Sequence, residues 1–161
     1  MLVRDLCTSE VVCCRPQTTA LEAARLMRHK HVGDVVVVDD PLERRVPLGI
    51  VTDRDLVVEI LGDDRDAATT VLSTLVDRPV VIARDTEDAS VVIERMRTHG
   101  VRRVPVVDER ESLVGIVTLD DLLPAIAQQL RELAATAAPE PRRHGRDMAS
   151  VTQPYVERSI L

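Results

Sequence analysis

The octapeptide GIVTDRDL at residues 49–56 returns as GIVTLDDL at residues 115–122, with six of the eight letters unchanged. The stretches before it also correspond, since HVGDVVVVD at residues 31–39 matches HGVRRVPVVD at residues 99–108. One unit therefore occurs twice. A repeat of this length does not bury its apolar face alone, so we expect the two copies to pack on each other as a closed pair with pseudo-twofold symmetry.

The composition favours a folded domain with an aliphatic core. The chain has 161 residues, of which 45% are hydrophobic, and this is enough apolar surface for a core. Phe and Trp are absent and Tyr155 is the only aromatic residue, so any bound base would lie between aliphatic side chains. A formal charge of -6 argues against affinity for nucleic acid phosphates.

Targeting and redox signals are also absent from the sequence. The start, MLVRDLCTSE, lacks the features of a signal peptide, and no run of about 18 apolar residues occurs, which predicts a cytoplasmic protein without a membrane partner. Cys7, Cys13 and Cys14 show no CxxC spacing and are interpreted as small buried hydrophobes. A metal site formed by His29 and His31 with Cys13 and Cys14 is a weaker alternative, because histidines also stabilise a helix C-terminus.

Apolar spacing predicts the order β-α-β-β-α in each copy, an α/β (α+β) fold. In the first copy we expect strands at residues 11–14, 34–38 and 47–52, a helix at 19–30 and a helix from 53 that ends at Gly62. In the second copy we expect strands at residues 80–83, 102–107 and 113–118, a helix at 87–98 and a last helix reaching about 137. Short helices at residues 2–6 and 71–75 precede the first strands.

The chain accordingly divides into a first repeat at residues 1–66, a second at 67–137 and a C-terminal tail at 138–161. The tail loses the periodicity and gains Pro, Arg and Ser, which predicts a flexible or partner-dependent segment. Pro124 leaves two possibilities for the last helix. If Thr118 caps it, Pro124 removes a backbone hydrogen bond, whereas a helix that starts two or three residues later accommodates the proline.

The shared string G-I-V-T-x-x-D-L carries residue types suited to a nucleotide. Its Thr, at 52 or 118, stands where a strand becomes a helix, and a helix start offers free amides to an anion such as phosphate. The carboxylate three residues later, Asp55 or Asp121, suits the two hydroxyls of a ribose. The alternative is that each Thr is an ordinary N-cap and each Asp complements the helix dipole. Recurrence inside a matching unit favours the nucleotide interpretation.

These features resemble a tandem pair of CBS domains, a Bateman module, over roughly residues 1 to 133. The resemblance implies that the repeats pack through their sheets and form two clefts, which in many members bind AMP, ADP, ATP or S-adenosylmethionine. It also implies a regulatory ligand, with no cofactor required. For the second-repeat cleft it implies the residues Ile116, Thr118, Asp120, Asp121, Arg102, Arg103, Val32, Gly33 and Val12. For the first-repeat cleft it implies the residues Ile50, Thr52, Arg54, Asp55, Gly33, Asp34, Val101, Arg102 and Val81.

The two implied clefts differ in charge. Arg102 and Arg103 fall where the family often places phosphate contacts, whereas Asp34 replaces the basic residue of the first cleft, where Arg54 could compensate. We therefore expect a phosphorylated ligand at the cleft with Thr118 and Asp121 rather than at its counterpart.

No catalytic site is predicted, because the sequence has no GxxxxGK, GxSxG, HExxH or GxGxxG motif. The serious alternative to ligand sensing is a module that dimerises or docks to an unknown protein partner and leaves its clefts empty. Apolar helix faces within residues 21–27, 56–61, 91–96 and 122–133 exceed what one pair of small sheets covers, so we expect a homodimer.

Overall fold

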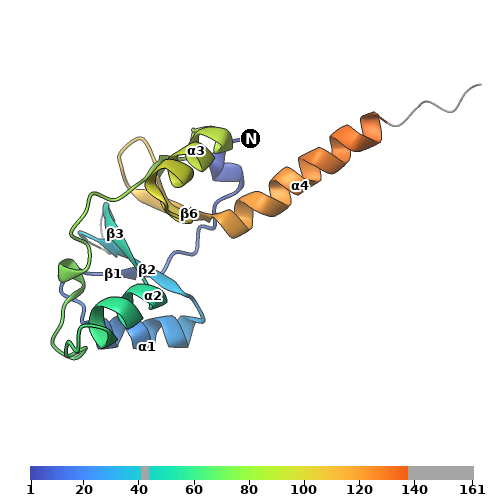
Figure 1. The fold of residues 1–161 in the computed structure, drawn as a ribbon. Helices are drawn as coiled ribbons and strands as arrows, with labels where there is room; N and C mark the ends of the chain where they lie inside the picture. Colours follow the sequence, from blue (N-terminus) through green and yellow to red (C-terminus); the bar gives the residue numbers. More distant parts are fainter. Residues whose placement is uncertain (41–43, 138–161) are drawn as a thin grey trace, which may run out of the picture.

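Each copy of the repeat forms a three-stranded sheet, with strand orders β1-β2-β3 and β4-β5-β6. The computed structural model describes residues 1–40 and 44–137 (Figure 1). The first copy contains η1 (Val3–Asp5), β1 (Cys13–Cys14), α1 (Ala20–Lys30), β2 (Asp34–Val38), β3 (Pro47–Thr52), α2 (Asp53–Asp55) and η2 (Leu56–Leu61). The second contains η3 (Leu72–Thr74), β4 (Ala83–Arg84), α3 (Ala89–His99), β5 (Arg103–Val107), β6 (Leu113–Thr118) and α4 (Leu119–Thr136).

The predicted β-α-β-β-α order and the α/β class are confirmed. The first strand of each sheet is shorter than predicted, because only two residues pair with the next strand. In the first copy these are Cys13 and Cys14, within the predicted residues 11–14. In the second copy they are Ala83 and Arg84, so the prediction of residues 80–83 is wrong except at Ala83. The hairpin strands agree more closely with the prediction. Both hairpins shift register at equivalent positions, between Val37 and Val38 in β2 and between Val106 and Val107 in β5. The predicted short helices are single 3-10 turns.

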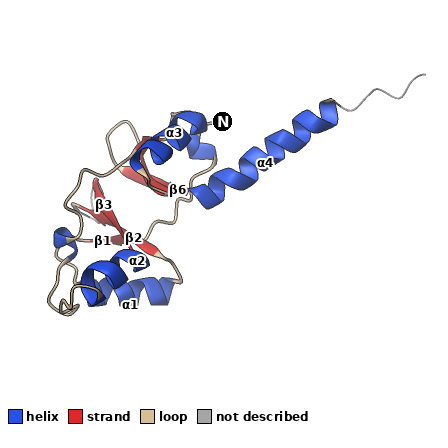
Figure 2. Cartoon of the chain, viewed as in Figure 1, coloured by secondary structure: helices blue, strands red, loops and turns tan. Residues whose placement is uncertain are grey.

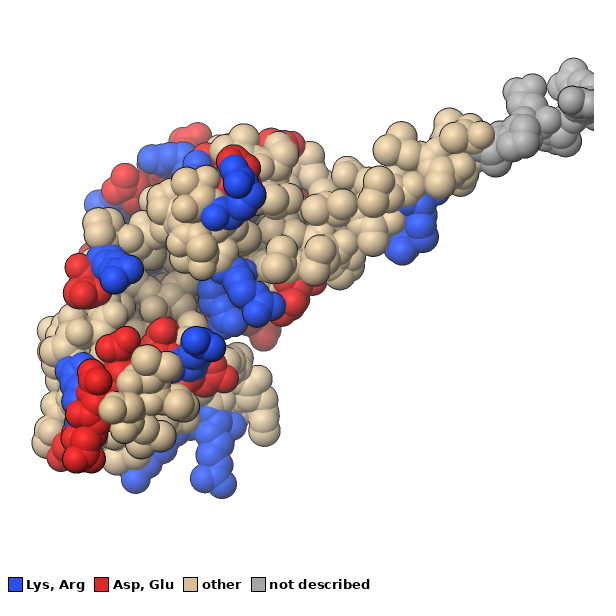
Figure 3. All heavy atoms as spheres, viewed as in Figure 1, with Lys and Arg blue, Asp and Glu red and all other residues tan. Residues whose placement is uncertain are grey.

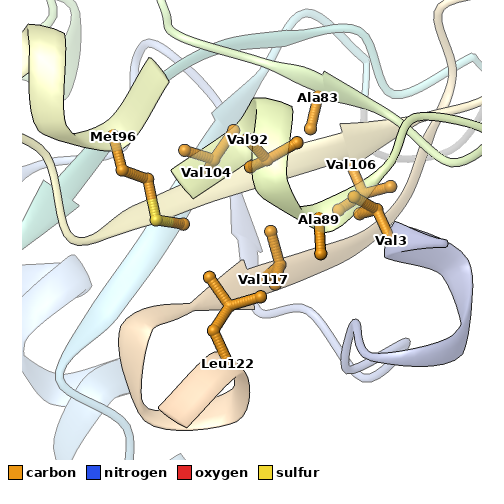
Figure 4. Close-up of a cluster of buried hydrophobic side chains, with 9 residues drawn as sticks. All are labelled: Val3, Ala83, Ala89, Val92, Met96, Val104, Val106, Val117 and Leu122. Carbon is orange, nitrogen blue, oxygen red and sulfur yellow. The ribbon is translucent and has the colours of Figure 1, made fainter. Parts of the chain in front are cut away.

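Three apolar clusters hold the fold together. One lies inside each repeat, between its sheet and its helix, and Figure 4 shows that of the second repeat. The third joins the two sheets and is built from the buried residues Val36, Val38, Leu113 and Ile116. Helices α1 and α3 lie on the outer sides of the sheets (Figure 2). The sheets therefore face each other as the resemblance implied.

The turns that precede the first strands cross over to the opposite repeat. Val3, in η1, is fully buried in the core of the second repeat, and Leu72, in η3, is fully buried in the core of the first. Backbone hydrogen bonds fix both crossings, from Val3 N to Glu87 O (3.0 Å) and from Leu72 N to Thr18 O (2.9 Å). The core of each repeat is therefore completed by the turn that stands before the first strand of the other repeat.

The helices after the two octapeptides differ, and here the internal symmetry fails. In the first repeat α2 gives way to the π-helical η2, which packs against α1. Gly62 ends it as predicted, with φ -65°. In the second repeat α4 continues for 18 residues and projects away from the two sheets (Figure 1).

Pro124 lies inside α4, and Thr118 is its N-cap. The helix therefore does not begin at Asp120 or Asp121, and that way of accommodating the proline is wrong. Pro124 has no N–H to donate to the carbonyl of Asp120 four residues earlier. The helix tolerates this loss close to its start, where the capping residue supplies other hydrogen bonds.

Candidate nucleotide-binding site

Each octapeptide closes a reciprocal capping box at the start of its helix. Thr118 Oγ1 accepts a hydrogen bond from Asp121 N (3.3 Å), while Thr118 N and Oγ1 donate to Asp121 Oδ2 at 2.8 and 2.7 Å. Thr52 and Asp55 repeat this arrangement, with N and Oγ1 of Thr52 each 2.8 Å from Asp55 Oδ2. The motif residues therefore have a structural role whether or not a ligand binds.

The capping interpretation of the Thr and Asp residues is thus correct at the local level. It leaves room for a second role, because all the capping bonds to Asp121 end on Oδ2 and none on Oδ1. Thr118 and Asp121 are both half-buried, so a ligand can reach them. Asp120, next to them, is exposed on the first turn of α4.

The loop before each hairpin strand is tied to the same helix start. Arg102 O accepts a hydrogen bond from Leu119 N (2.9 Å), and Gly33 O accepts the equivalent bond from Asp53 N (3.0 Å). The strand register adds the next residue, because Arg103 pairs with Thr118 across the β5–β6 hairpin. The structure therefore brings the predicted polar residues of the second cleft together.

The equivalent residues of the first repeat are held in the same way but carry the opposite charge. Asp34 pairs with Thr52 across the β2–β3 hairpin, at the position that Arg103 holds in the second repeat. The carboxylate of Asp53 lies 3.6 Å from where a Cβ on Gly33 would stand. Arg54 is exposed on the outer turn of α2, and its backbone N–H donates to Asp53 Oδ1 (2.7 Å).

An ion pair connects the two groups of predicted cleft residues. The Arg103 guanidinium binds the Asp34 carboxylate across the junction between the repeats, and both side chains are mostly shielded from solvent. Arg102, beside it, is exposed. On the face drawn in Figure 3 the surface is hollowed between the two halves, and acidic and basic side chains border the hollow.

The predicted apolar residues fall into two groups. Ile50 and Ile116 belong to the cluster between the sheets, Ile116 as one of its buried members. The four valines instead pack against the core of their own repeat, and these are Val12 and Val32 in the first and Val81 and Val101 in the second. All four valines are only partly buried, so each keeps surface that a base could cover.

A groove that the motif does not explain lies on the outer face of the first repeat. It has a volume of about 610 Å³ and runs between α1 and η2. Its walls are mainly apolar, with Leu21, Val57 and Leu61 among them, and Val32 is the one predicted cleft residue that lines it. The sequence signal for it was the excess of apolar residues on these two helices.

The cysteines agree only in part with the prediction of buried hydrophobic residues, because Cys14 is buried whereas Cys7 and Cys13 are half-buried. All three are free thiols, and burial raises the pKa of each, that of Cys14 to about 11. A raised pKa disfavours the thiolate that metal binding and nucleophilic chemistry need. Within residues 1–40 and 44–137, no three His, Cys, Asp or Glu side chains come close enough to hold a metal ion.

The family model for the CBS domain matches the chain twice, at residues 3–62 and 72–128. The chain belongs to the CBS-domain family. It is 38% identical over 138 residues to the CBS domain-containing protein YhcV of Bacillus subtilis, covering 84% of this chain and 91% of that protein. Among its relatives, the chain spans 60% of the length of protein MK0525 of Methanopyrus kandleri, 87% of YlbB of Bacillus subtilis and 91% of YhcV.

Two solved structures share the fold of this CBS pair. The CBS domain protein PAE2072 from Pyrobaculum aerophilum, complexed with AMP, superposes with a TM-score of 0.70 at 25% identity, covering 82% of this chain and 99% of that one. Hypoxic Response Protein I, with two coordinated zinc ions, superposes with a TM-score of 0.67 at 30% identity, covering 77% and 98%. Among the described residues, no helix has the length and apolar character needed to cross a membrane.

Proposed function

We propose that this CBS pair is a regulatory module that binds an adenosine-containing ligand between its repeats. The observation that most supports this proposal is the repeated capping box, with Arg102 and Arg103 held beside its second copy. The AMP complex of the related Pyrobaculum protein supports this ligand class. AMP, ADP, ATP and S-adenosylmethionine are the candidates, and no further cofactor is required. A cytoplasmic location remains part of the proposal.

At the second cleft, the predicted residues divide the ligand between them. Arg102 and Arg103 meet a phosphate beside Thr118, because arginine binds phosphate through two donors and the partial positive charge at the start of α4 also attracts an anion. Asp121 Oδ1, which the cap does not use, accepts from the ribose hydroxyls. The apolar contacts to the base come from the partly buried residues Val12, Val32 and Gly33 and from Ile116 in the cluster between the sheets.

Replacing Asp121 by Asn tests the ribose contact while retaining an oxygen that can accept the capping hydrogen bonds. We expect the affinity for AMP to fall about tenfold or more, since a charge-assisted hydrogen bond contributes about 1.5–3 kcal/mol. Isothermal titration calorimetry with AMP, ATP and S-adenosylmethionine measures this. Glu132→Gln, an exposed change on the same helix, is the control.

These titrations test both whether an adenosyl ligand binds and where it binds. If no adenosyl compound binds the unmodified protein, ligand sensing is wrong and the docking alternative gains support. If binding is unaffected by Asp121→Asn, the ligand occupies a different place. The simpler variant Asp121→Ala is less informative, because it also removes the capping box and costs about 1 kcal/mol of helix stability.

The signal is a change in how repeats or subunits pack, which requires a ligand that binds one arrangement more tightly. We propose a homodimer as the assembly that responds, because large apolar side chains remain exposed on the outer helices. The most exposed of these are Val57, Leu61, Val91, Leu123, Leu130 and Leu133. The tail at 138–161, a candidate for capturing another protein, lies outside the described residues.

Sedimentation equilibrium tests the dimer. We expect the protein to sediment as a dimer and the double variant Val57→Gln, Leu61→Gln to shift toward monomer, because both side chains border the groove between α1 and η2. Glu59→Gln, on the same short helix, serves as the matched control and stays dimeric. A monomeric unmodified protein at all concentrations contradicts the proposal.

A further inference from the structure

Asp34 and Arg103 occupy equivalent positions in the two repeats and carry opposite charges. Each is the first residue of its hairpin strand, and each stands opposite the threonine of its own octapeptide, Thr52 or Thr118. Strand pairing therefore places Asp34 beside the first capping box and Arg103 beside the second. The internal duplication alone would have put two like residues here.

The two side chains are paired with each other rather than with separate partners. Arg103 binds Asp34 across the repeat junction, with the side chains 32% and 20% exposed. At this degree of shielding the attraction is screened less than it would be on an open surface. The cation that stands opposite Thr118 in the β5–β6 register is thus partly neutralised by a carboxylate that comes from the other repeat.

We infer that Asp34 determines ligand specificity by competing with a ligand's phosphate for Arg103. This inference rests on the proposed binding of an adenosyl ligand. A phosphate at the start of α4 gains the full attraction of Arg103 only if the guanidinium leaves Asp34. A phosphate near Thr52 meets the Asp34 carboxylate directly. An adenosyl compound without a phosphate experiences neither penalty.

Both effects act on the phosphate and neither acts on the adenosine moiety. Asp121, assigned to the ribose, forms its hydrogen bonds with Thr118, and Ile116, assigned to the base, lies in the apolar cluster between the sheets. Asp34 therefore shifts the balance between phosphorylated and unphosphorylated adenosyl ligands. It lowers the gain that Arg102 and Arg103 would otherwise give to AMP or ATP at the second cleft.

Calorimetric titration of Asp34→Asn with AMP and with adenosine tests the inference. The variant keeps the size of the side chain and removes the charge, so we expect AMP to bind about tenfold more tightly and adenosine to change by less than about twofold. In the double variant Asp34→Asn, Arg103→Gln the gain for AMP disappears, because the freed guanidinium is its source. Asp34→Ser repeats the test if the first variant folds poorly.

The failures of the two proposals are distinguishable. If AMP and adenosine bind but Asp34→Asn changes neither affinity, or changes both equally, the competition is overturned and ligand binding stands. If neither AMP nor adenosine binds the unmodified protein or Asp34→Asn, the inference fails, whereas the proposed function fails only if ATP, ADP and S-adenosylmethionine also do not bind. A gain for AMP that persists in the double variant also overturns the role of Arg103.

Discussion

Gly49→Ala is expected to destabilise the protein by about 2–3 kcal/mol, although glycine is normally an unfavourable residue within a strand. A Cβ at position 49 would lie 2.4 Å from Cγ1 and 2.6 Å from Cβ of Val76. Val76 follows η3 and packs against the core of the first repeat, so the side chain has little room to move. Urea unfolding followed by circular dichroism measures the loss.

The control and the rescue both follow from the same geometry. At Gly33 a Cβ would meet nothing nearer than Asp53 Oδ2 at 3.6 Å, so Gly33→Ala changes stability by less than about 0.5 kcal/mol. In a Val76→Gly background the cost of Gly49→Ala should fall by at least about 1 kcal/mol, because contacting residues couple. Equal costs in the two backgrounds would show that Val76 is not the obstacle.

Leu122→Ala is expected to cost about 2–5 kcal/mol, since it removes a fully buried side chain from the core of the second repeat. Figure 4 shows Leu122 pointing from α4 toward Val117 and the other core residues. This contact anchors the first turns of a helix whose remainder projects from the body of the protein (Figure 1). Urea unfolding measures the effect.

The neighbouring residue provides the comparison. Leu123 is 55% exposed, and Leu123→Ala should change stability by less than about 0.5 kcal/mol. Measuring both variants at two protein concentrations separates any contribution from self-association, which makes apparent stability depend on concentration. Equal losses in Leu122→Ala and Leu123→Ala would mean that α4 does not enter the core as described.

Several local features could be predicted because short-range chemistry decides them. The hairpin strands at residues 34–38 and 113–118 follow from β-branched runs, and the threonine caps follow from Thr and Asp three residues apart. Pro124 suggested a later start for the last helix, and that alternative is wrong. Its lost hydrogen bond is real, but the helix still begins at the Thr118 cap.

The octapeptide glycines show where such reasoning stops. A glycine lets a neighbour approach the backbone closely, but the sequence does not show which neighbour does so. At Gly49 it is Val76, and at Gly115 it is Cys7, whose Sγ lies 2.8 Å from where a Cβ would stand. Both approaching residues follow the turns that cross between repeats. Crossing of this kind depends on contacts between residues far apart in the chain, which no local pattern encodes.

By itself the sequence determined the duplication, the β-α-β-β-α order and the residues at each helix start, because periodicity and capping act within a few residues. The tertiary structure alone decided three things: the exchange of η1 and η3, the divergence of η2 from α4, and the pairing of Asp34 with Arg103. Each depends on how two similar surfaces meet, and a charge difference between equivalent positions becomes an attraction only when the repeats are brought face to face.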